Sequence, residues 1–265
     1  SDGLGAIFPP IIWTVVALCC QGFAEDSPEV QSQLDELKAL VISDGQTDRL
    51  QPCKSPVWDT SIATIALRDA GVRSEHPRMK RAVDWLLAKE VRQSGDWSVR
   101  NPDQEPAGWF FEFNNRFYPD VDDTCMVVMA LARCLPSIAE WDADFLLDDW
   151  SPHENDKDAS AVIAARDEDS YLTAGHVESM RPMLGAIHRG ARWILAMQSS
   201  DGGWGAFDRD NNRDLFTQVP FADHNAMIDP SSADLTSRML EMFADLNVPM
   251  NHPAIKRAIP YLWAE

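Results

Sequence analysis

The stretch "DDTCMVVMAL" (residues 122–131) decides the fold, because altered copies of it recur along the chain. The copies are "PPIIWTVVAL" (9–18), "WDTSIATIAL" (58–67) and "DLTSRMLEMF" (234–243). In each one a turn is followed by apolar residues at helical spacing, while alternating strand patterns are scarce in the chain. Self-similarity of this kind is typical of stacked helix pairs. We therefore expect an all-α fold.

The first position of this repeat holds residues of unlike chemistry, namely Pro9, Trp58, Asp122 and Asp234. Stacked helix pairs would aim these helix starts at one common region, so a tryptophan and two acids are expected to meet there. Side-chain oxygens near the starts can accept from unpaired first-turn amides. The predicted N-caps are Asp59, Thr60, Asp123 and Thr124.

A second repeat precedes the helix starts: "WLLAKEVRQSGDW" (85–97) and "WILAMQSSDGGW" (193–204). Glu90 or Gln198 stands near the end of each helix and is followed by a tryptophan. We expect the amide or carboxylate to bind nearby backbone while the tryptophan packs across neighbouring helices. The terminal "YLWAE" begins a third copy, and "SDGLGAIF" resembles the tail of one, so we expect an internal piece of a longer chain.

The charge of the chain is strongly acidic, with 42 acidic and 23 basic residues among 265 and a net charge of -19. Bulk electrostatics therefore disfavour nucleic acid and anionic membranes as partners. Much of the charge lies between Glu140 and Glu178, where 12 acids accompany Lys157 and Arg166. This stretch interrupts the repeat, so we predict an insertion at about 137–180, as a surface loop with short helices.

Five cysteines, at positions 19, 20, 53, 125 and 134, show neither paired metal spacing nor a disulfide framework. This usage suits a reducing compartment, and buried thiols are expected. The apolar stretch from Ala6 to Cys20 contains two prolines and is shorter than a membrane span, so a buried helix is expected there. The histidines show no metal-ligand spacing.

The acids Asp120, Asp122 and Asp123 lie between aromatic residues and an apolar helix, and four interpretations are open. They could be an N-cap run, a divalent-metal site, the paired carboxylates of an α/α-barrel glycosidase, or a catalytic acid. Carboxylates this close, buried among Trp58, Phe111 and Tyr118, would not all ionise, so one could keep its proton at neutral pH. Such an acid could protonate a carbon–carbon double bond, and aromatic faces would stabilise the carbocation.

Several motifs in the same order resemble bacterial squalene–hopene cyclases. They are "SPVWDT", "SGDWSVRNP", "FYPDVDDTCMVVMAL", "QSSDGGWGAFDRDN" and "PFADHNAMIDPSSADLT". The resemblance covers nearly the whole chain apart from the insertion. It implies an α/α barrel (toroid) of repeated helix pairs, incomplete in this chain, with the end of a first barrel in 1–53 and part of a second in 54–265. Oxidosqualene cyclases place a D-C-T-A-E stretch at the acids, so the resemblance favours squalene as substrate.

The resemblance also implies roles for single residues. Asp122 matches the family's proton donor, Asp120 and Asp123 match its supporting acids, and Asp234 matches a further acid near the donor. Trp58 and Phe111 match aromatic residues that line the cavity and stabilise cations, and Phe221 matches a constriction of the substrate channel.

Two positions depart from the best-known member of the family. Arg238 stands where that member has a histidine bonded to the donor; arginine is permanently charged and could still polarise Asp122, but proton return would need another route. Phe207 replaces a tyrosine of the cavity and keeps the aromatic face.

The implied reaction is an isomerisation. Asp122 protonates a terminal alkene of squalene, rings close through carbocations to hopene or hopanol, and no metal or other cofactor takes part. The family is monotopic, which implies a peripheral position on the cytoplasmic face of the bacterial membrane, and it often forms homodimers. Two rival interpretations stay open: a cyclase of another polyprenyl substrate, such as a class II diterpene cyclase, and a catalytically inactive fragment.

Overall fold

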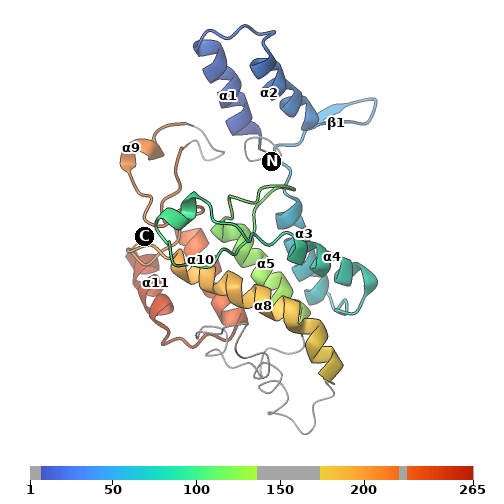
Figure 1. Ribbon diagram of the computed structural model, residues 1–265, viewed down its shortest axis with the longest axis vertical. Helices are drawn as coiled ribbons and strands as arrows, with labels where there is room; N and C mark the ends of the chain where they lie inside the picture. The colour runs from blue at the N-terminus through green and yellow to red at the C-terminus, as the bar shows by residue number, and fades with distance from the viewer. Residues whose placement is uncertain (1–6, 136–173, 221–225, 265) are drawn as a thin grey trace. The chain divides into compact units, whose positions relative to one another are not determined.

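The computed structural model describes residues 7–135, 174–220 and 226–264, and helices dominate them, as the repeat predicts (Figure 1). The core of the predicted acidic insertion, residues 136–173, lies outside the described residues. The chain divides into two compact units. Unit 1 comprises residues 1–56, 111–115 and 211–229, and unit 2 comprises residues 57–110, 116–210 and 230–265.

Unit 1 contains a pair of packed helices, α1 (Phe8–Cys20) and α2 (Pro28–Ala39). The side chain of Ser27 accepts a hydrogen bond from the Val30 amide and so begins α2. A short antiparallel hairpin follows, formed by β1 (Val41–Ser43) and β2 (Asp48–Leu50). The single-turn helix α9 (Asp214–Thr217) also belongs to this unit.

The apolar segment at the start of the chain forms helix α1, but the prediction that it is buried is wrong. Pro10 and Ile11 are its buried residues, whereas Trp13 and Val16 are exposed. Within unit 1, α2 packs on α1 and can cover one face of it.

The prediction that the cysteines are buried is also only partly correct. Cys125 and Cys134 are buried as predicted, Cys53 is half-buried, and Cys19 and Cys20 at the end of α1 are exposed.

Unit 2 is built around helix α5 (Val121–Cys134), which packs against both α8 (Ala174–Ala196) and α10 (Ala233–Asp245) (Figure 1). Nearly every residue of α5 is buried, as expected for a helix that is apolar on all sides. Gly190 of α8 allows close approach, because a Cβ there would lie 2.7 Å from Val128 Cγ2. The described part of this unit also contains α3 (Pro56–Asp69), α4 (Pro77–Ala88), the 3₁₀ turn η1 (Asp96–Val99) and α11 (Pro253–Ala264).

Helix α8 begins at Ala174, which lies inside the range predicted for the insertion, 137–180. The last part of that range is therefore the start of a 23-residue helix, which as a whole packs on α5.

The helix starts lie earlier than predicted. Asp120 is the N-cap of α5, and α3 begins at Pro56, so the expected caps Asp59, Thr60, Asp123 and Thr124 all lie inside the helices. The alignment itself holds, because its first position falls in the first turn of every copy. Trp58, Asp122 and Asp234 are the second or third residues of α3, α5 and α10.

Trp109 and Trp204 make the same set of hydrogen bonds in the two repeats of unit 2. The Trp109 indole Nε1 donates to the Leu86 carbonyl at 2.7 Å, and Trp204 Nε1 donates to the Ile194 carbonyl at 2.7 Å. Their backbone amides donate to Thr124 Oγ1 at 2.9 Å and to Thr236 Oγ1 at 3.2 Å. Each tryptophan thus joins the end of one helix to the start of the next.

These bonds correct the alignment of the second sequence repeat, which paired Trp204 with Trp97. The counterpart of Trp204 is Trp109. Trp204 follows Gln198 by six positions, but Trp109 follows Glu90 by nineteen, because the loop that carries η1 separates them. Trp97 is also buried, with its ring edge-on to Trp193 at 5.7 Å between centroids.

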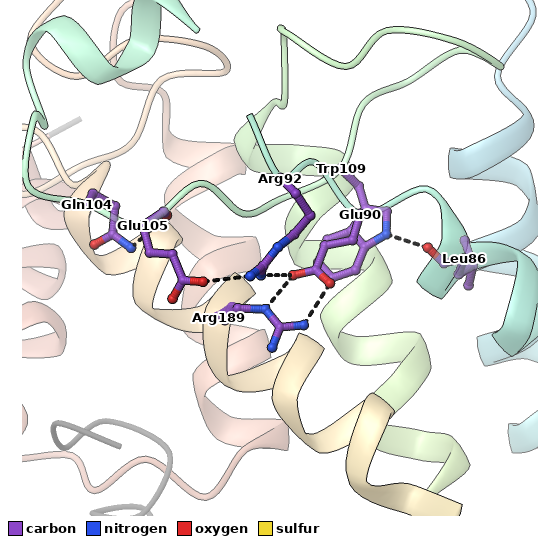
Figure 2. Close-up of polar contacts among 7 residues, drawn as sticks. All are labelled: Leu86, Glu90, Arg92, Gln104, Glu105, Trp109 and Arg189. Carbon is purple, nitrogen blue, oxygen red and sulfur yellow. Dashed lines mark hydrogen bonds and ion pairs between the residues drawn. The ribbon is translucent and has the colours of Figure 1, made fainter. Parts of the chain in front are cut away.

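Arginine side chains hold one repeat to the next through Glu90 and Gln198, and Figure 2 shows the bonds of Glu90. Arg189 of α8 donates from Nε and Nη2 to the two carboxylate oxygens of Glu90, each at 2.7 Å, and Arg92 adds a bond of 3.2 Å. The equivalent bond in the next repeat runs from Arg257 of α11 to Gln198 Oε1.

The two arginines occupy the same repeat position, four residues before an aromatic residue of their own helix. Gln198 also donates from Nε2 to the backbone carbonyls of Gly202 at 2.8 Å and Ala254 at 3.0 Å, which matches the expected backbone contact. Glu90 uses a salt bridge at the same place.

Candidate active site

The three clustered acids occupy the cap and first turn of α5. Asp120 has an extended backbone, and its side chain accepts from the Asp123 amide at 2.7 Å, which fixes the helix start. Asp120 and Asp123 are buried, and the Asp122 side chain is 28% exposed. Arg238 of α10 donates from Nη1 to Asp122 Oδ1. The cluster is therefore partly withdrawn from water, as the sequence predicts.

Burial is the main cause that raises the pKa of Asp120 well above its ordinary value. The charge of Asp123 and a side-chain hydrogen bond with Asp123 raise that pKa further. A hydrogen bond between two carboxyl groups requires a proton on one of them. Asp120 and Asp123 therefore form a pair that retains a proton at a higher pH than an exposed acid would.

Burial also raises the pKa of Asp122, and the charge of Asp234 acts in the same direction. The hydrogen bond and the charge of Arg238 lower this pKa, but the net direction is upward. Asp122 is thus an acid that holds its proton more firmly than an exposed aspartate. A cation beside it is ready to stabilise the carboxylate once the proton leaves.

Arg238 of α10 contacts side chains of two other helices, α5 and α3. Its guanidinium binds Asp122 of α5, and its Cζ lies 5.2 Å from the ring centroid of Trp58 of α3. Asp234, one turn earlier on α10, is exposed, and a hydrogen bond with Ser232 lowers its pKa. Trp58, Asp122 and Asp234, which share the first repeat position, therefore all act on one guanidinium.

Cys125 is a member of this group that sequence reasoning missed. Its Sγ donates to the backbone carbonyl of Arg238 at 3.4 Å, and burial raises the pKa of the thiol. Cys125 follows Asp122 by three positions, so the helical repeat places both on one face of α5. Nothing in the sequence relates that face to Arg238.

The predicted aromatic lining is brought to the acids only in part. Trp58 reaches the group through Arg238. Phe207 is exposed, with its ring edge-on to Tyr118 at 6.1 Å between centroids. Phe111 is half-buried and belongs to unit 1, and Phe221 lies outside the described residues.

Tyr118 differs from the expectation that it is buried beside the acids. It is exposed, and its hydroxyl donates to Asp96 Oδ2, a bond that raises the pKa of the phenol.

The described residues contain neither a metal-binding cluster nor a membrane-spanning helix. No group of three or more His, Cys, Asp or Glu side chains in that part of the chain is arranged to hold a metal ion. Among the same residues, no helix combines the length and apolar character that a membrane span needs.

Comparison with known proteins identifies the family of this chain. The family model described as "Squalene-hopene cyclase C-terminal domain" matches residues 54–144 and 137–265. The chain belongs to the squalene–hopene cyclase family. The model described as "Squalene-hopene cyclase N-terminal domain" matches residues 1–46, so both domains of the squalene–hopene cyclase family are represented. The helical repeats fit the α/α barrel that the resemblance implies.

Relatives from a fungus, a bacterium and a fern illustrate the match to squalene–hopene cyclases. The "Squalene-hopene cyclase" of Schizosaccharomyces japonicus is 35% identical over 100% of this chain and 35% of its own length. The "Squalene--hopene cyclase" of Zymomonas mobilis is 32% identical over 100% of this chain and 35% of its own. The "Dammaradiene synthase" of Dryopteris crassirhizoma is 35% identical over 94% of the chain and 30% of its own. The chain spans about a third of the length of these curated relatives.

Proposed function

We propose that this chain carries the acid site of a squalene–hopene cyclase type triterpene cyclase, in which Asp122 protonates a terminal alkene of squalene. The observation that carries the proposal is the state of Asp122. It stands in the first turn of a buried helix, its pKa is raised, and a permanent cation contacts it. An alkene is a very weak base, so its protonation needs an acid that keeps its proton in an apolar setting.

In this proposal Arg238 strengthens the acid at the moment of transfer. As the proton leaves, charge develops on the Asp122 carboxylate, and the guanidinium that already touches it stabilises that charge without reorganisation. Arginine does not itself give up a proton at working pH, so it cannot return one to Asp122. Asp120, Asp123 and Asp234 are the supporting acids.

The remaining steps are assigned to aromatic side chains and to the substrate itself. Trp58, Phe111 and Phe207 are proposed to line the cavity in which rings close, since aromatic faces attract cations. Phe221 is proposed to lie at a constriction of the substrate channel. The last cation loses a proton or takes up water, giving hopene or hopanol, so the reaction consumes no redox equivalent and needs no cofactor.

The partners follow from the apolar substrate. Squalene partitions into the hydrocarbon of a bilayer, so an enzyme that takes it up is expected to lie on a membrane surface. We propose a peripheral, monotopic position of the whole protein on the cytoplasmic face of a bacterial membrane, with homodimer formation, as in the family it resembles.

A second candidate is a cyclase that gives a different polycyclic product or takes another polyprenyl substrate. The dammaradiene synthase of Dryopteris crassirhizoma is as similar to this chain, at 35%, as the squalene-hopene cyclase of Schizosaccharomyces japonicus. Product analysis separates the candidates.

The test uses the whole protein encoded by the gene. The protein is incubated with squalene, and cyclic products are identified by gas chromatography with mass spectrometry. Asp122→Asn should reduce cyclisation about 10²-fold or more, as expected when a general acid is removed. Asp59→Asn is the matched control, because Asp59 is an exposed acid in the equivalent first turn of α3. Normal cyclisation by a folded Asp122→Asn protein would contradict the assignment, and the 265-residue chain alone should form no hopene.

A further inference from the structure

The ring of Trp58 faces a cation that belongs to the protein. Arg238 Cζ lies 5.2 Å from the ring centroid, within the range of about 6 Å over which an aromatic face attracts a guanidinium. We propose that Trp58 is a positioning residue that holds Arg238 against Asp122, so that it acts through the arginine. This role adds to the place in the cavity lining that is proposed for Trp58 above. The consequence of this role for catalysis rests on the proposed function, whereas the contact between Trp58 and Arg238 does not.

The guanidinium has separate surfaces for its two neighbours. It is planar, with donors along its edge and a flat face that stacks on aromatic rings. One edge donor, Nη1, is used by Asp122, and the ring of Trp58 lies against the cationic centre. The two contacts come from different helices, α5 and α3, and therefore restrain the side chain from two directions.

The backbone of Arg238 is held independently of its side chain. Cys125 Sγ donates to the Arg238 carbonyl at 3.4 Å, which ties α10 to α5 at this point. Only the long, flexible stem of the arginine is left for Trp58 to restrain. Since the Arg238 side chain is 29% exposed, a guanidinium released from the ring would have solvent to enter.

The charged groups around Asp122 make such a release detectable. Arg238 and Asp234 act on it from α10, and Asp120, Asp123 and Cys125 stand near it on α5. Trp58, from α3, is uncharged. Among the causes that act on Asp122, only Arg238 lowers its pKa, whereas burial and Asp234 raise it. Displacement of the guanidinium should therefore raise the pKa of Asp122 further.

The first test uses the unaltered 265-residue chain. Arginine Nε–H signals are recorded by ¹H–¹⁵N NMR, and the Arg238 signal is assigned by its loss in Arg238→Lys. A guanidinium over the indole face should show an upfield ring-current shift of its side-chain protons relative to Arg133, which binds the carboxylates of Asp69 and Asp245. Trp58→Phe should reduce this shift. An Arg238 signal with the same shift as Arg133 overturns the proposal.

The second test is a double-mutant cycle that follows the pKa of Asp122 by ¹³C NMR of its carboxyl carbon. Trp58→Leu should raise this pKa when residue 238 is arginine and leave it nearly unchanged in the Arg238→Met background. Equal shifts in both backgrounds would mean that the ring acts on Asp122 by desolvation alone, which overturns the proposal. If Trp58→Leu does not fold, Trp58→Phe replaces it in the cycle, with a smaller rise expected.

Neither measurement depends on turnover, so the two proposals fail separately. If Trp58 affects the pKa of Asp122 only when Arg238 is present, and Asp122→Asn still cyclises squalene fully, then the positioning role of Trp58 is retained and Asp122 is not the proton donor. If Asp122→Asn loses cyclisation but Trp58 has the same effect on the pKa of Asp122 with and without Arg238, then Asp122 is retained as the donor and the positioning role of Trp58 is rejected.

Discussion

The Asp120 side chain accepts a 2.7 Å hydrogen bond from the Asp123 amide, so one acid of the cluster is also the N-cap of α5. The two tasks place opposite demands on the carboxyl group. Capping favours a carboxylate, whereas burial beside Asp123 disfavours its charge and raises its pKa. The start of α5 is therefore less stable than it would be with an uncharged N-cap residue.

Replacement of Asp120 should separate these tasks. Asp120→Asn keeps the cap, removes the buried charge and should increase the free energy of unfolding at pH 7. Asp120→Ala loses the cap as well and should be less stable than Asp120→Asn by about 1 kcal/mol. Both values follow from urea denaturation of the chain monitored by circular dichroism. Equal stability of the two variants would contradict the capping role.

The pH dependence of stability follows from the direction of the same shifts. Asp120 and Asp122 have pKa values above the ordinary value of 3.8, so between 3.8 and the raised values the folded chain binds more protons than the unfolded chain. Their contribution to stability therefore falls as pH rises through that window. Asp120→Asn/Asp122→Asn should lose less stability between about pH 4 and pH 7 than the unaltered chain does.

Asp210 and Asp234 titrate in the opposite sense and serve as the control. Hydrogen bonds with serine help to hold both pKa values below the ordinary one, so their stabilising contribution is lost as pH falls through those lowered values. Asp210→Asn should therefore lower the stability above about pH 4 and reduce the loss of stability that the unaltered chain shows below that pH. An identical pH profile for the unaltered chain and the Asp120/Asp122 double variant would show that the acid cluster does not titrate abnormally.

The sequence could predict those features of the fold that depend on local pattern. Apolar spacing identifies the helices, and the repeat alignment correctly places Trp58, Asp122 and Asp234 in equivalent first turns. Proximity in sequence also identifies the acid cluster, because three carboxyl groups in four positions must share one helix end.

Features that depend on the partners chosen by a side chain could not be predicted. The loop with η1 hides the equivalence of Trp109 and Trp204, which becomes visible only through their bonds to Leu86 and Ile194. Tyr118 precedes the acids in sequence, but the position of Asp96 decides where its hydroxyl binds. The contact between Arg238 and Trp58 joins helices far apart in sequence, which no local pattern encodes.

The arginine bonds between repeats should differ in strength, because Glu90 is charged and Gln198 is not. Arg189→Met leaves a carboxylate that is 8% exposed and that, among the described residues, still pairs with Arg92, and it should cost about 2–3 kcal/mol of unfolding free energy. Arg257→Met leaves a neutral amide that keeps its bonds to Gly202 and Ala254, and should cost about 1 kcal/mol.

The double variant Glu90→Gln/Arg189→Met tests the cause of this difference. It removes the buried charge together with its partner, so it should recover part of the stability lost in Arg189→Met. Guanidinium chloride denaturation measures all four chains. Equal losses in Arg189→Met and Arg257→Met would show that the charge of Glu90 adds nothing to the contact.

Gly108 lies in the segment that precedes α5. Both its backbone conformation and its surroundings disfavour any residue with a side chain at this position. Its φ is +101°, and a Cβ would lie 2.8 Å from Thr124 Oγ1 and 3.0 Å from Pro119 Cβ. Gly71 has a similar φ of +88° but open space around it, so Gly71→Ala should cost about 1 kcal/mol, from backbone strain alone. Gly108→Ala should cost a further 1–3 kcal/mol or so, from overpacking. Equal losses on guanidinium chloride denaturation would mean that Thr124 moves aside without cost, although its Oγ1 accepts the Trp109 amide.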